Sequence, residues 1–371
     1  MSGNGRLRVL HVGKFYPPHM GGMETHLQAL CEKLKDTIDV GVVVANDGRR
    51  TQRESVDGVS VTRAGTLLNL AAAPICPAMV SKIRNSNSDI VHIHLPNPAA
   101  ILSYLASGHR GLLVLTYHSD IVRQQMLARG FQPILDKALR RSAAVIATSP
   151  NYVDSSPVLA AHRARCSVIP YGIPHERFLQ CDGGAVARIH EQYGPRIIVS
   201  VGRLIYYKGF EYLIRAMSRV DARLLIIGEG PLRGRLERQA RESGVMDRVA
   251  FLGEISNENI APYYHAAEVF VLASVARSEA FGIVQLEAMA CGKPVVNTRL
   301  NSGVPFVSLD RVTGLTVAPA DSDALAHAIN LLLDDSKLRA TYGAAGRLRV
   351  EQEFTLDRMV NRTLALYREL S

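Results

Sequence analysis

The sequence has no tryptophan, few aromatic residues of any kind (6%) and no apolar run of about eighteen residues, so no transmembrane helix is expected. No zinc finger, KH loop or RNP pattern occurs, which disfavours a nucleic-acid-binding protein. The start, MSGNGRLRVLHVGKF, enters a strand pattern almost at once, without an apolar leader or a small-residue cleavage site. We therefore expect a cytoplasmic protein that carries no export signal.

Cysteine is also scarce. No two of the five cysteines form a CxxC pair, and they are scattered over the chain at Cys31, Cys76, Cys166, Cys181 and Cys291. This distribution is typical of reduced, mostly buried thiols and argues against a disulfide framework or a zinc site.

Lys and Arg outnumber Asp and Glu mainly in the first half of the chain. Residues 1–171 hold 19 Lys and Arg against 11 Asp and Glu, a net charge of +8, whereas residues 172–371 hold 24 against 23, a net charge of +1. Such a basic half could face an anionic membrane, an anionic substrate or a nucleic acid, and the last is the least supported.

Short apolar strands alternate with helical patterns along the whole chain, which predicts parallel sheets covered by helices on both faces. One series of strand candidates comprises residues 8–12, 40–45, 59–64, 90–94, 112–117 and 143–149, and a second comprises residues 167–173, 196–202, 222–228, 248–253, 268–274 and 293–298. Two doubly wound α/β halves are the simplest interpretation, with a linker at 170–178 and a last helix over 356–370 that packs on the first half. In such sheets ligands bind beyond the carboxyl ends of the strands, so we expect the site in a cleft between the halves.

Three strand-to-helix loops could hold phosphate. In residues 12–30, Gly21 and Gly22 open a helix, and an anion site and an ordinary tight turn are equally supported there. In residues 200–217, Arg203 and Lys208 bracket a loop before a helix, which suits a diphosphate clamp, although two solvated cations would look the same. In residues 226–240, the glycines that begin with Gly228 would let a ligand lie close to the backbone.

The segment SEAFGIVQLEAMACGKP, residues 278–294, carries two glutamates in apolar surroundings. Glu279 and Glu287 are eight residues apart, about 12 Å in a regular helix. A glycosidase pair requires a separation of about 5–9.5 Å, so a hydrolytic pair is disfavoured. We interpret the two carboxylates as acceptors for the two ends of one extended ligand, with the backbone N–H groups of Phe281, Gly282 and Ile283 facing phosphate between them.

Together these loops resemble the retaining GT-B glycosyltransferases of the glycogen-synthase-like, RfaG-type group (group 1, family 4), in particular the bacterial polysaccharide and O-antigen enzymes. The resemblance runs from PPHMGGMETHLQAL through VGRLIYYKGFEYLIRA, GEGPLRGRLE and FLGEISNENI to SEAFGIVQLEAMACGKPVV and TGLTV. It implies two Rossmann-like doubly wound domains facing a cleft: an acceptor-binding domain (1–171 with 355–371) and a nucleotide-sugar-binding domain (172–354). The implied activity is transfer of a hexose from a nucleotide sugar to a hydroxyl of a glycan or a polyprenyl- or lipid-linked acceptor.

The resemblance also implies a role for each matching residue. Arg203 and Lys208 would hold the donor diphosphate, Glu279 would accept hydroxyls of the donor sugar and Glu287 those of the ribose. Phe281, Gly282 and Ile283 would offer backbone N–H groups to sugar or phosphate. The remaining implied contacts are His118 beside the transferred sugar, Gly21 and Gly22 near phosphates and acceptor, Gly228 at the donor and Leu252 at the nucleobase.

The implied mechanism is front-face transfer with retention, in which the departing nucleotide diphosphate helps to deprotonate the acceptor hydroxyl. No metal and no other cofactor is expected, because cations and helix N-termini would neutralise the leaving group. Where many relatives read GGxPE, this chain reads SGVPF at residues 302–306. Some bacterial polysaccharide transferases of this appearance use GDP-mannose or a related GDP-sugar, so we expect a mannose-type donor, with a UDP-sugar as the alternative.

Two further features have competing interpretations. His92 and His94 share one face of a strand and could suggest a metal, but no third ligand is spaced nearby, so hydrogen-bonded strand histidines are favoured, and His11 is interpreted as structural. Residues 120–141 combine apolar positions with Arg123, Arg129, Lys137, Arg140 and Arg141, which suits either a helix on an anionic membrane or the solvated face of a domain helix.

Four other functions fit the sequence less well. A phosphorylase on the same two-domain plan would need a longer chain and a lysine for a pyridoxal cofactor, and an epimerase does not explain the paired glutamates. A Rossmann oxidoreductase lacks its glycine fingerprint here. A non-catalytic nucleotide- or glycan-binding protein is the alternative from another class, against which the intact set Arg203, Lys208 and Glu279 argues.

Overall fold

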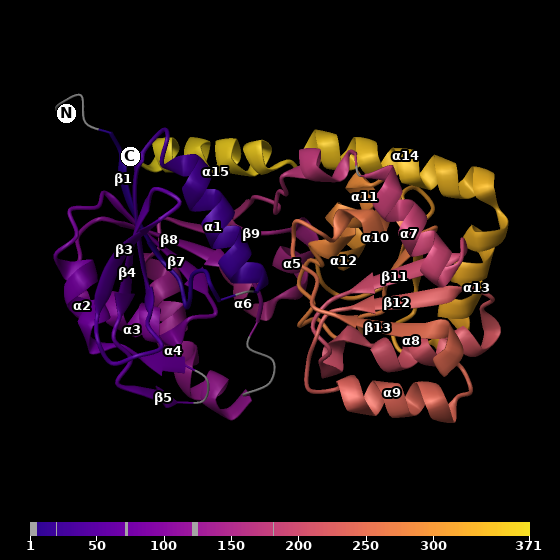
Figure 1. Ribbon diagram of the computed structural model, residues 1–371. Coiled ribbons are helices and arrows are strands. Elements are labelled where there is room, and N and C mark those ends of the chain that lie inside the picture. Colours follow the sequence, from indigo (N-terminus) through magenta and orange to yellow (C-terminus); the bar gives the residue numbers. More distant parts are fainter. Residues whose placement is uncertain (1–5, 20, 71–72, 121–124, 181) are drawn as a thin grey trace. The chain divides into compact units, whose positions relative to one another are not determined.

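The computed structural model describes residues 6–19, 21–70, 73–120, 125–180 and 182–371. The chain forms two compact units: Met1–Tyr171 together with Leu356–Ser371, and Gly172–Thr355. Each unit contains a mainly parallel sheet with helices packed on it (Figure 1), so the predicted α/β fold class is confirmed.

Within the described ranges, the sheet of the first unit has eight strands, of which only the edge strand β3 is antiparallel. Its strands are, in spatial order, β10 (Cys166–Val168), β9 (Ala144–Ala147), β8 (Leu112–Tyr117), β7 (Ile90–Leu95), β1 (Arg8–Val12), β2 (Asp39–Ala45), β4 (Val59–Ala64) and β3 (Gln52–Val56). All six residues of β7 are buried, as expected for a central strand covered on both faces.

The prediction that residues 167–173 begin the second series of strands is wrong. Ser167 of β10 is in register with Ile146 of β9, so this strand closes the first sheet. Strand β3 was not predicted, because its sequence, QRESV, is almost wholly polar and exposed. The antiparallel pair of short strands β5 (Leu68–Leu70) and β6 (Ala73–Ile75) was not predicted either.

The last helix belongs to the first unit, as predicted. The side chain of Tyr367 in this helix is fully buried, and Lys33 pairs with Asp357 at 2.9 Å. The helices of this unit are α1 (Gly22–Leu34), α2 (Pro77–Arg84), α3 (Pro98–Ser107), α4 (Gln125–Arg141), α5 (Pro150–Ser155), α6 (Pro157–Ala160) and α15 (Leu356–Leu370).

In the part of the second unit that the structure describes, the sheet has six strands, all parallel. Its strands lie in the order β13 (Val249–Gly253), β12 (Arg223–Ile227), β11 (Ile197–Val201), β14 (Val269–Leu272), β15 (Val295–Thr298) and β16 (Gly314–Val317). Numbered by appearance this is 3-2-1-4-5-6, the doubly wound order in which a ligand binds at the point where the strand order reverses. That point lies between β11 and β14.

Helices cover both faces of this second sheet, with α8 and α9 on one side and α7, α10 and α11 on the other (Figure 1). The helices are α7 (Gly183–Tyr193), α8 (Phe210–Ala216), α9 (Arg233–Glu242), α10 (Ala261–Ala266), α11 (Val284–Ala290), α12 (Val304–Val307), α13 (Ser322–Asp334) and α14 (Ser336–Glu353). The core on the α8 side is built from apolar residues of the strands and of α8 and α13, for example Leu224, Leu213 and Ile329. This packing fixes the strand ends from which the site loops begin.

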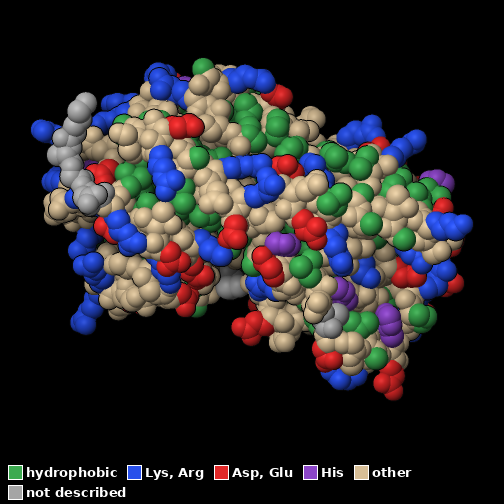
Figure 2. Space-filling view, turned by 90° about the horizontal axis from the view of Figure 1, so that it is seen from above, with side chains coloured by type: hydrophobic (Ala, Val, Ile, Leu, Met, Phe, Trp, Pro, Cys, Tyr) green, Lys and Arg blue, Asp and Glu red, His purple; other side chains and the backbone are tan. Residues whose placement is uncertain are grey.

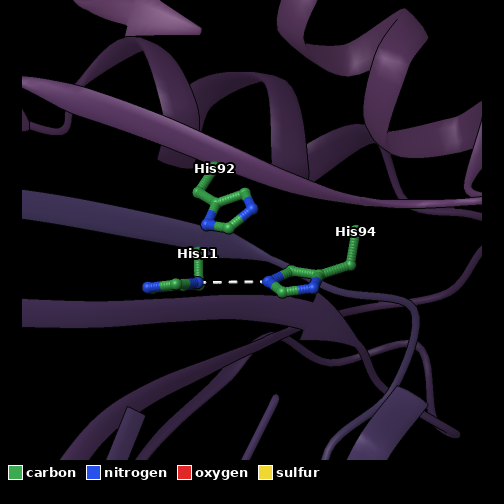
Figure 3. Close-up of side chains that lie close together, drawn as sticks. All are labelled: His11, His92 and His94. Atoms are coloured by element: carbon green, nitrogen blue, oxygen red, sulfur yellow. Dashed lines mark hydrogen bonds between the residues drawn. The ribbon is translucent and has the colours of Figure 1, made fainter. Parts of the chain in front are cut away.

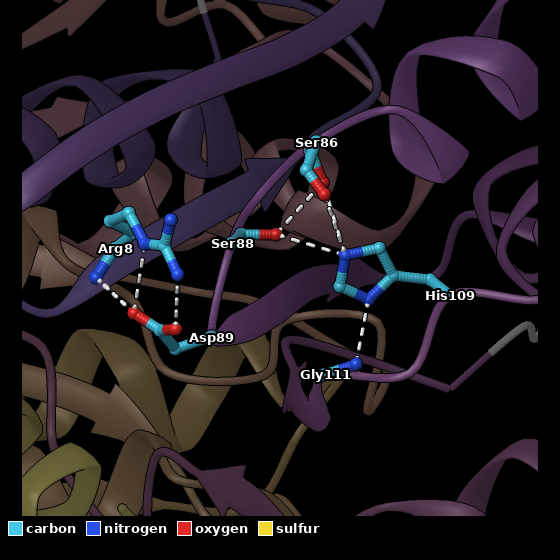
Figure 4. Close-up of polar contacts among 6 residues, drawn as sticks. All are labelled: Arg8, Ser86, Ser88, Asp89, His109 and Gly111. Atoms are coloured by element: carbon cyan, nitrogen blue, oxygen red, sulfur yellow. Dashed lines mark hydrogen bonds and ion pairs between the residues drawn. The ribbon is translucent and has the colours of Figure 1, made fainter. Parts of the chain in front are cut away.

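A polar cluster lies at the amino ends of β1, β7 and β8 (Figure 4). Two nitrogens of the Arg8 guanidinium and the Arg8 backbone N–H donate to the Asp89 carboxylate. Nearby, the ring of His109 contacts both Ser86 and Ser88 and accepts a hydrogen bond from the Gly111 N–H. These contacts connect the starts of neighbouring strands, at the opposite sheet edge from the loops expected to bind ligands, so we interpret them as structural.

The distribution of surface charges and the burial of the cysteines can be compared with what the composition predicts. On the face drawn in Figure 2, Lys and Arg side chains are spread among acidic ones rather than gathered in one patch. Among the described cysteines, Cys31, Cys76 and Cys291 are buried free thiols and Cys166 is partly buried, while Cys181 lies outside the described residues. None of the helices in the described ranges is both long and apolar enough to cross a membrane.

Candidate functional site

The centre of the candidate site is a buried ion pair at the carboxyl edge of the second sheet. Lys208 ends a short 3-10 turn (Tyr206–Lys208) after β11, and Glu279 lies in the loop after β14. The Lys208 ammonium nitrogen lies 2.6 Å from Oε2 of Glu279, and the Ser274 hydroxyl donates to the same oxygen at 3.0 Å. The two loops on either side of the strand-order reversal therefore meet through opposite charges.

The environment keeps Lys208 charged. Burial alone would lower the pKa of the ammonium, but the Glu279 carboxylate outweighs that effect and raises the pKa above its ordinary value. An ammonium group has three N–H donors, and Glu279 takes one of them. The other oxygen of Glu279, Oε1, has no hydrogen bond to any described residue, so it can accept one from a ligand.

Arg203 lies in the same loop as Lys208 but is exposed. Its guanidinium has neither an ion pair nor a hydrogen bond with another residue in the described ranges. The sequence places Arg203 and Lys208 together as two cations, whereas the structure separates a buried, paired ammonium from an exposed, unpaired guanidinium. The two cations therefore differ in both burial and pairing.

Glycines allow the loops at this edge to approach one another closely. Gly209 has φ +68°, and a Cβ there would lie 2.0 Å from the carbonyl oxygen of Ala273. Gly228 has φ +131°, and its Cβ would lie 2.3 Å from the carbonyl oxygen of Gly202. Close packing of neighbouring loops is thus a sufficient reason for glycine at 228, beside the predicted role at the donor. The Gly228 N–H also donates to Gly253, which places Leu252 of β13 next to this loop.

The second glutamate lies on α11 and has a partner that the sequence did not reveal. Tyr264, from α10, donates its hydroxyl to Oε2 of Glu287 at 2.6 Å. Burial raises the pKa of the Glu287 carboxyl, although the Tyr264 hydrogen bond and the charge of Arg177 oppose the rise. Glu279 and Glu287 therefore bond to different residues of the protein.

Helix α11 starts later than predicted. Its first residue is Val284 rather than Phe281, and Gly282 before it has φ +74°. The Phe281 ring is buried and packs edge-on against Phe354, with ring centroids 6.1 Å apart. Among the described residues no acceptor is found for the backbone N–H groups of Gly282 and Ile283, so these two remain available to a ligand.

In the first unit, Gly21 and Gly22 lie at the start of α1, directly after Met20, which is outside the described residues. Gly21 is extended (φ 175°), and a Cβ there would lie 2.4 Å from a carboxylate oxygen of Glu24. A Cβ on Gly22 would meet no atom of the described residues within 4 Å, so packing against them does not require a glycine at that position. Both predicted interpretations of this loop stay open.

The first unit also contains a cluster of buried histidines around His94 (Figure 3). His11 lies beside His92 in the parallel register of β1 and β7, and its Nδ1 is 3.1 Å from Nε2 of His94. His118, after β8, has its Nε2 3.0 Å from Nδ1 of His94. No third ligand is spaced near His92 and His94 in the sequence, but the fold brings further histidine rings to them from neighbouring strands.

Two sets of three histidines have ring nitrogens within 4.8 Å of one another: His11, His92 and His94, and His26, His94 and His118. These are the described residues whose spacing could admit a metal ion. As expected from the sequence, however, both ring nitrogens of His94 are already hydrogen-bonded to other histidines. His92 is likewise bonded, to Tyr367 at 2.5 Å and to Thr116 at 2.6 Å. A metal would have to displace these bonds.

The basic segment at 120–141 is only partly described. Val122 and Arg123 lie outside the described residues, and the side chains of residues 125–129, including Met126 and Arg129, are not described either. In the described part, Leu135 and Leu139 are buried, Arg140 pairs with Asp136, and Arg141 lies over the ring of Tyr104. This half of α4 is therefore a packed domain helix, and its apolar side is not free for a membrane.

Comparison with known proteins assigns both units to described families. The family described as "Glycosyltransferase Family 4" matches residues 20–177, and the family described as "Glycosyl transferases group 1" matches residues 187–349. Among solved structures, a sucrose-phosphate synthase from Thermosynechococcus elongatus superimposes with a TM-score of 0.83 at 25% identity, covering 98% of this chain and 99% of that one.

Three similar curated proteins span nearly the full length of the chain. The O-antigen chain mannosyltransferase C of Escherichia coli is 31% identical, covering 98% of this chain and 99% of that protein. The D-rhamnosyltransferase WbpZ of Pseudomonas aeruginosa is 32% identical, covering 94% and 92%. A GDP-mannose-dependent alpha-(1-6)-phosphatidylinositol monomannoside mannosyltransferase of Mycolicibacterium smegmatis is 32% identical, covering 91% and 92%.

Proposed function

The chain belongs to the group 1, family 4 glycosyltransferases, and from this premise we propose that it transfers a mannose-type hexose from a GDP-sugar with retention of configuration. The observation that carries the proposal is the buried Lys208–Glu279 pair beside the exposed Arg203, at the point where the strand order of a doubly wound sheet reverses. The pair offers, side by side, cationic donors for a diphosphate and an anionic acceptor for sugar hydroxyls.

We assign the donor contacts as follows. The two remaining N–H donors of Lys208 and the Arg203 guanidinium bind the diphosphate, and Oε1 of Glu279 accepts a hydroxyl of the hexose. Glu287, held by Tyr264, accepts the ribose hydroxyls. Backbone N–H groups from Phe281 to Ile283 face sugar or phosphate, and Gly228 and Leu252 border the nucleotide. In the first unit, His118 contacts the transferred sugar, and Gly21 and Gly22 leave room near the acceptor.

In the proposed reaction, the bond between the sugar anomeric carbon and the diphosphate oxygen breaks, and the same face of the sugar receives the acceptor oxygen. The acceptor proton passes to the departing diphosphate, whose charge Arg203 and Lys208 stabilise. Since both cations belong to the chain itself, we propose that transfer needs no metal. Activity in excess EDTA would support this, and restoration only by an added divalent ion would contradict it.

The choice of donor rests on relatives and on the SGVPF stretch at 302–306. Two of the similar proteins are named as mannosyltransferases, one of them GDP-mannose-dependent, while another is named as a D-rhamnosyltransferase. A UDP-sugar is the alternative, and a non-catalytic nucleotide- or glycan-binding protein is the alternative from another class. A thermal-shift panel of GDP, UDP, ADP and TDP separates the bases, because at equal concentration the diphosphate that binds more tightly stabilises the folded protein more.

The acceptor is proposed to be a hydroxyl of a glycan or of a polyprenyl- or lipid-linked saccharide. An enzyme acting on a lipid-linked acceptor would work at the inner face of the cytoplasmic membrane, and the net charge of +8 on residues 1–171 suits an anionic surface. Flotation with liposomes, with and without anionic lipid at low salt, tests this point. Transfer to a synthetic lipid-linked acceptor, followed by NMR of the new anomeric proton, tests activity and retention together.

A further inference from the structure

Three histidines and a tyrosine of the first unit form one continuous chain of hydrogen bonds. His11 Nδ1 contacts His94 Nε2 at 3.1 Å, and His94 Nδ1 contacts His118 Nε2 at 3.0 Å. His118 Nδ1 then contacts the hydroxyl of Tyr171. The three histidines come from β1, from β7 and from the residue after β8, so the chain of bonds crosses the sheet towards its carboxyl edge.

The three rings of this chain are neutral. Burial lowers the pKa of His11 to about 3 and lowers the pKa values of His94 and His118 well below the ordinary value for histidine. A neutral imidazole carries one proton, so one nitrogen donates and the other accepts. If His94 donates from Nδ1, its Nε2 must accept from His11. All bonds in the chain therefore share one direction, and no ring can reverse alone.

The direction of donation is indicated by His11, at the end of the chain of hydrogen bonds. Nε2 of His11 is buried and has no hydrogen-bond partner among the described residues. If the chain ran from Tyr171 towards His11, this nitrogen would carry an orphaned N–H, which is rare in protein interiors. If it runs from His11 towards Tyr171, the nitrogen carries only a lone pair. The second direction protonates His11, His94 and His118 at Nδ1.

The surrounding rings belong to other contacts. His92 stacks on His94 with ring centroids 4.5 Å apart, but its nitrogens bond to Thr116 and Tyr367. His26, from α1, meets the rings of His118 and Tyr171 edge-on at 5.2 and 4.8 Å. These neighbours restrict the rings sterically, and no hydrogen bond to them competes for the nitrogens of His118.

We propose that His94, itself aligned by His11, is a positioning residue that fixes His118 as the Nδ1–H tautomer, so that His118 meets its substrate as a hydrogen-bond donor and not as a base. The inference rests on the proposed function, in which His118 lies beside the transferred sugar. Nε2 of His118 is occupied by His94 and cannot take a proton. Its Nδ1–H donates to the Tyr171 oxygen, so a sugar hydroxyl oxygen would take the place of that oxygen as the acceptor when the substrate binds.

The tautomer is measured directly on the wild-type protein. In long-range ¹H–¹⁵N spectra of protein labelled at histidine nitrogen, the ring signals of His118 and His94 should show the Nδ1–H form, with no averaging between tautomers. Substitution of each histidine in turn assigns the signals. An Nε2–H signal for His118, or a signal averaged between the two forms, would overturn the proposal, whether or not the protein transfers sugar.

Two variants of His94 separate positioning from general packing. The amide nitrogen of asparagine lies near the place of Nδ1, so His94→Asn can still donate to His118, whereas glutamine places its amide near Nε2 and cannot. We expect His94→Gln to lower kcat about tenfold, the effect of one ordinary hydrogen bond, with KM for the nucleotide sugar unchanged. His94→Asn should stay within about threefold of wild type.

The buried His109, in the structural cluster at the opposite sheet edge, supplies the control. His109→Gln should lower thermal stability without changing kcat or the His118 spectrum. Equal kcat losses in His94→Asn and His94→Gln, or losses that only follow thermal stability, would overturn the proposal. If wild type transfers no sugar from any donor while His118 still shows the Nδ1–H signal, the proposed function fails and the tautomer assignment stands.

Discussion

The Lys208 ammonium lies 2.6 Å from Oε2 of Glu279, and these side chains are only 11% and 10% exposed. Removal of one partner would leave a nearly buried charge without its counter-ion, which typically costs about 3–5 kcal/mol. We therefore expect Lys208→Met and Glu279→Gln each to lose about 3 kcal/mol of unfolding free energy, and the double variant to lose clearly less than their sum. Urea unfolding of the four proteins measures this coupling.

A matched control comes from the exposed pair of Lys33 and Asp357, whose side chains are 50% and 65% exposed. Lys33→Met should cost at most about 1 kcal/mol. The rate of sugar transfer should fall roughly 10²–10³-fold in both single variants and in the double variant. The double variant regains stability, but it still lacks the charged groups that the reaction needs. Additive stability losses, or wild-type turnover in any of the three, would contradict the assignment.

The buried carboxyl of Glu287 should make the unfolding free energy depend on pH, and the sign of this dependence can be derived. Burial raises the pKa of its carboxyl in the folded state above the ordinary value of 4.5. A raised folded pKa means that its contribution to stability is fully present below the unfolded pKa and is lost as the pH rises through the folded pKa. Glu287→Gln cannot titrate, so its stability relative to wild type should improve between about pH 4.5 and pH 7.5.

Denaturant unfolding of wild type and Glu287→Gln at the two pH values checks this. A matched variant, Tyr264→Phe, removes the hydrogen bond that opposes the rise of the Glu287 pKa. The pH dependence of its unfolding free energy should therefore be steeper than that of wild type and extend to higher pH. A difference between Glu287→Gln and wild type that does not change with pH would show that the Glu287 carboxyl is not destabilised by its surroundings.

Gly209 and Gly108 share the same backbone angle but differ in their surroundings. Both have φ +68°, yet a Cβ at 209 would lie 2.0 Å from the Ala273 carbonyl oxygen, whereas a Cβ at 108 meets nothing within 4 Å. Gly108→Ala should therefore cost only the backbone strain, about 1–2 kcal/mol. Gly209→Ala should cost at least about 2 kcal/mol more, because the loop after β14 must move. Equal losses in thermal unfolding would mean that the two loops are not held together here.

The fold was predictable because its signal is local. Continuous buried runs such as Ile90–Leu95 produce central parallel strands wherever they occur between helices, and most predicted strands agree with the structure. Strand β10 was assigned to the wrong sheet, because a three-residue strand before a linker contains nothing that states which sheet it joins. Strand β3 has no apolar pattern, so only its pairing with β4 makes it a strand.

Parts of the site could not be read from the sequence, because their partners come from distant segments. Tyr264 lies on a different helix from Glu287, and no spacing rule connects the two. The histidine chain depends on the register of β1 against β7 and of β7 against β8. By contrast, Lys208 and Glu279 both follow strands that flank the reversal point of the sheet. Once the doubly wound order is assumed, their encounter follows from topology.

Arg203 differs from Lys208 in a way that separates binding from stability. Its guanidinium is exposed and has no partner among the described residues, so Arg203→Gln should unfold like wild type. Charge-assisted hydrogen bonds to a diphosphate contribute about 1.5–3 kcal/mol, so the dissociation constant for GDP should rise roughly 10- to 100-fold. Calorimetric titration with GDP measures this rise.

Arg203→Lys tests whether the planar geometry of the guanidinium matters for diphosphate binding or only its positive charge. Because one ammonium cannot bind two phosphate oxygens in the geometry of a guanidinium, we expect an affinity between those of wild type and Arg203→Gln. Arg235→Gln, on the exposed side of α9, is the control for loss of one positive charge at the surface. If Arg235→Gln raises the dissociation constant for GDP as much as Arg203→Gln does, the change in affinity reflects net charge, and Arg203 does not contact the diphosphate.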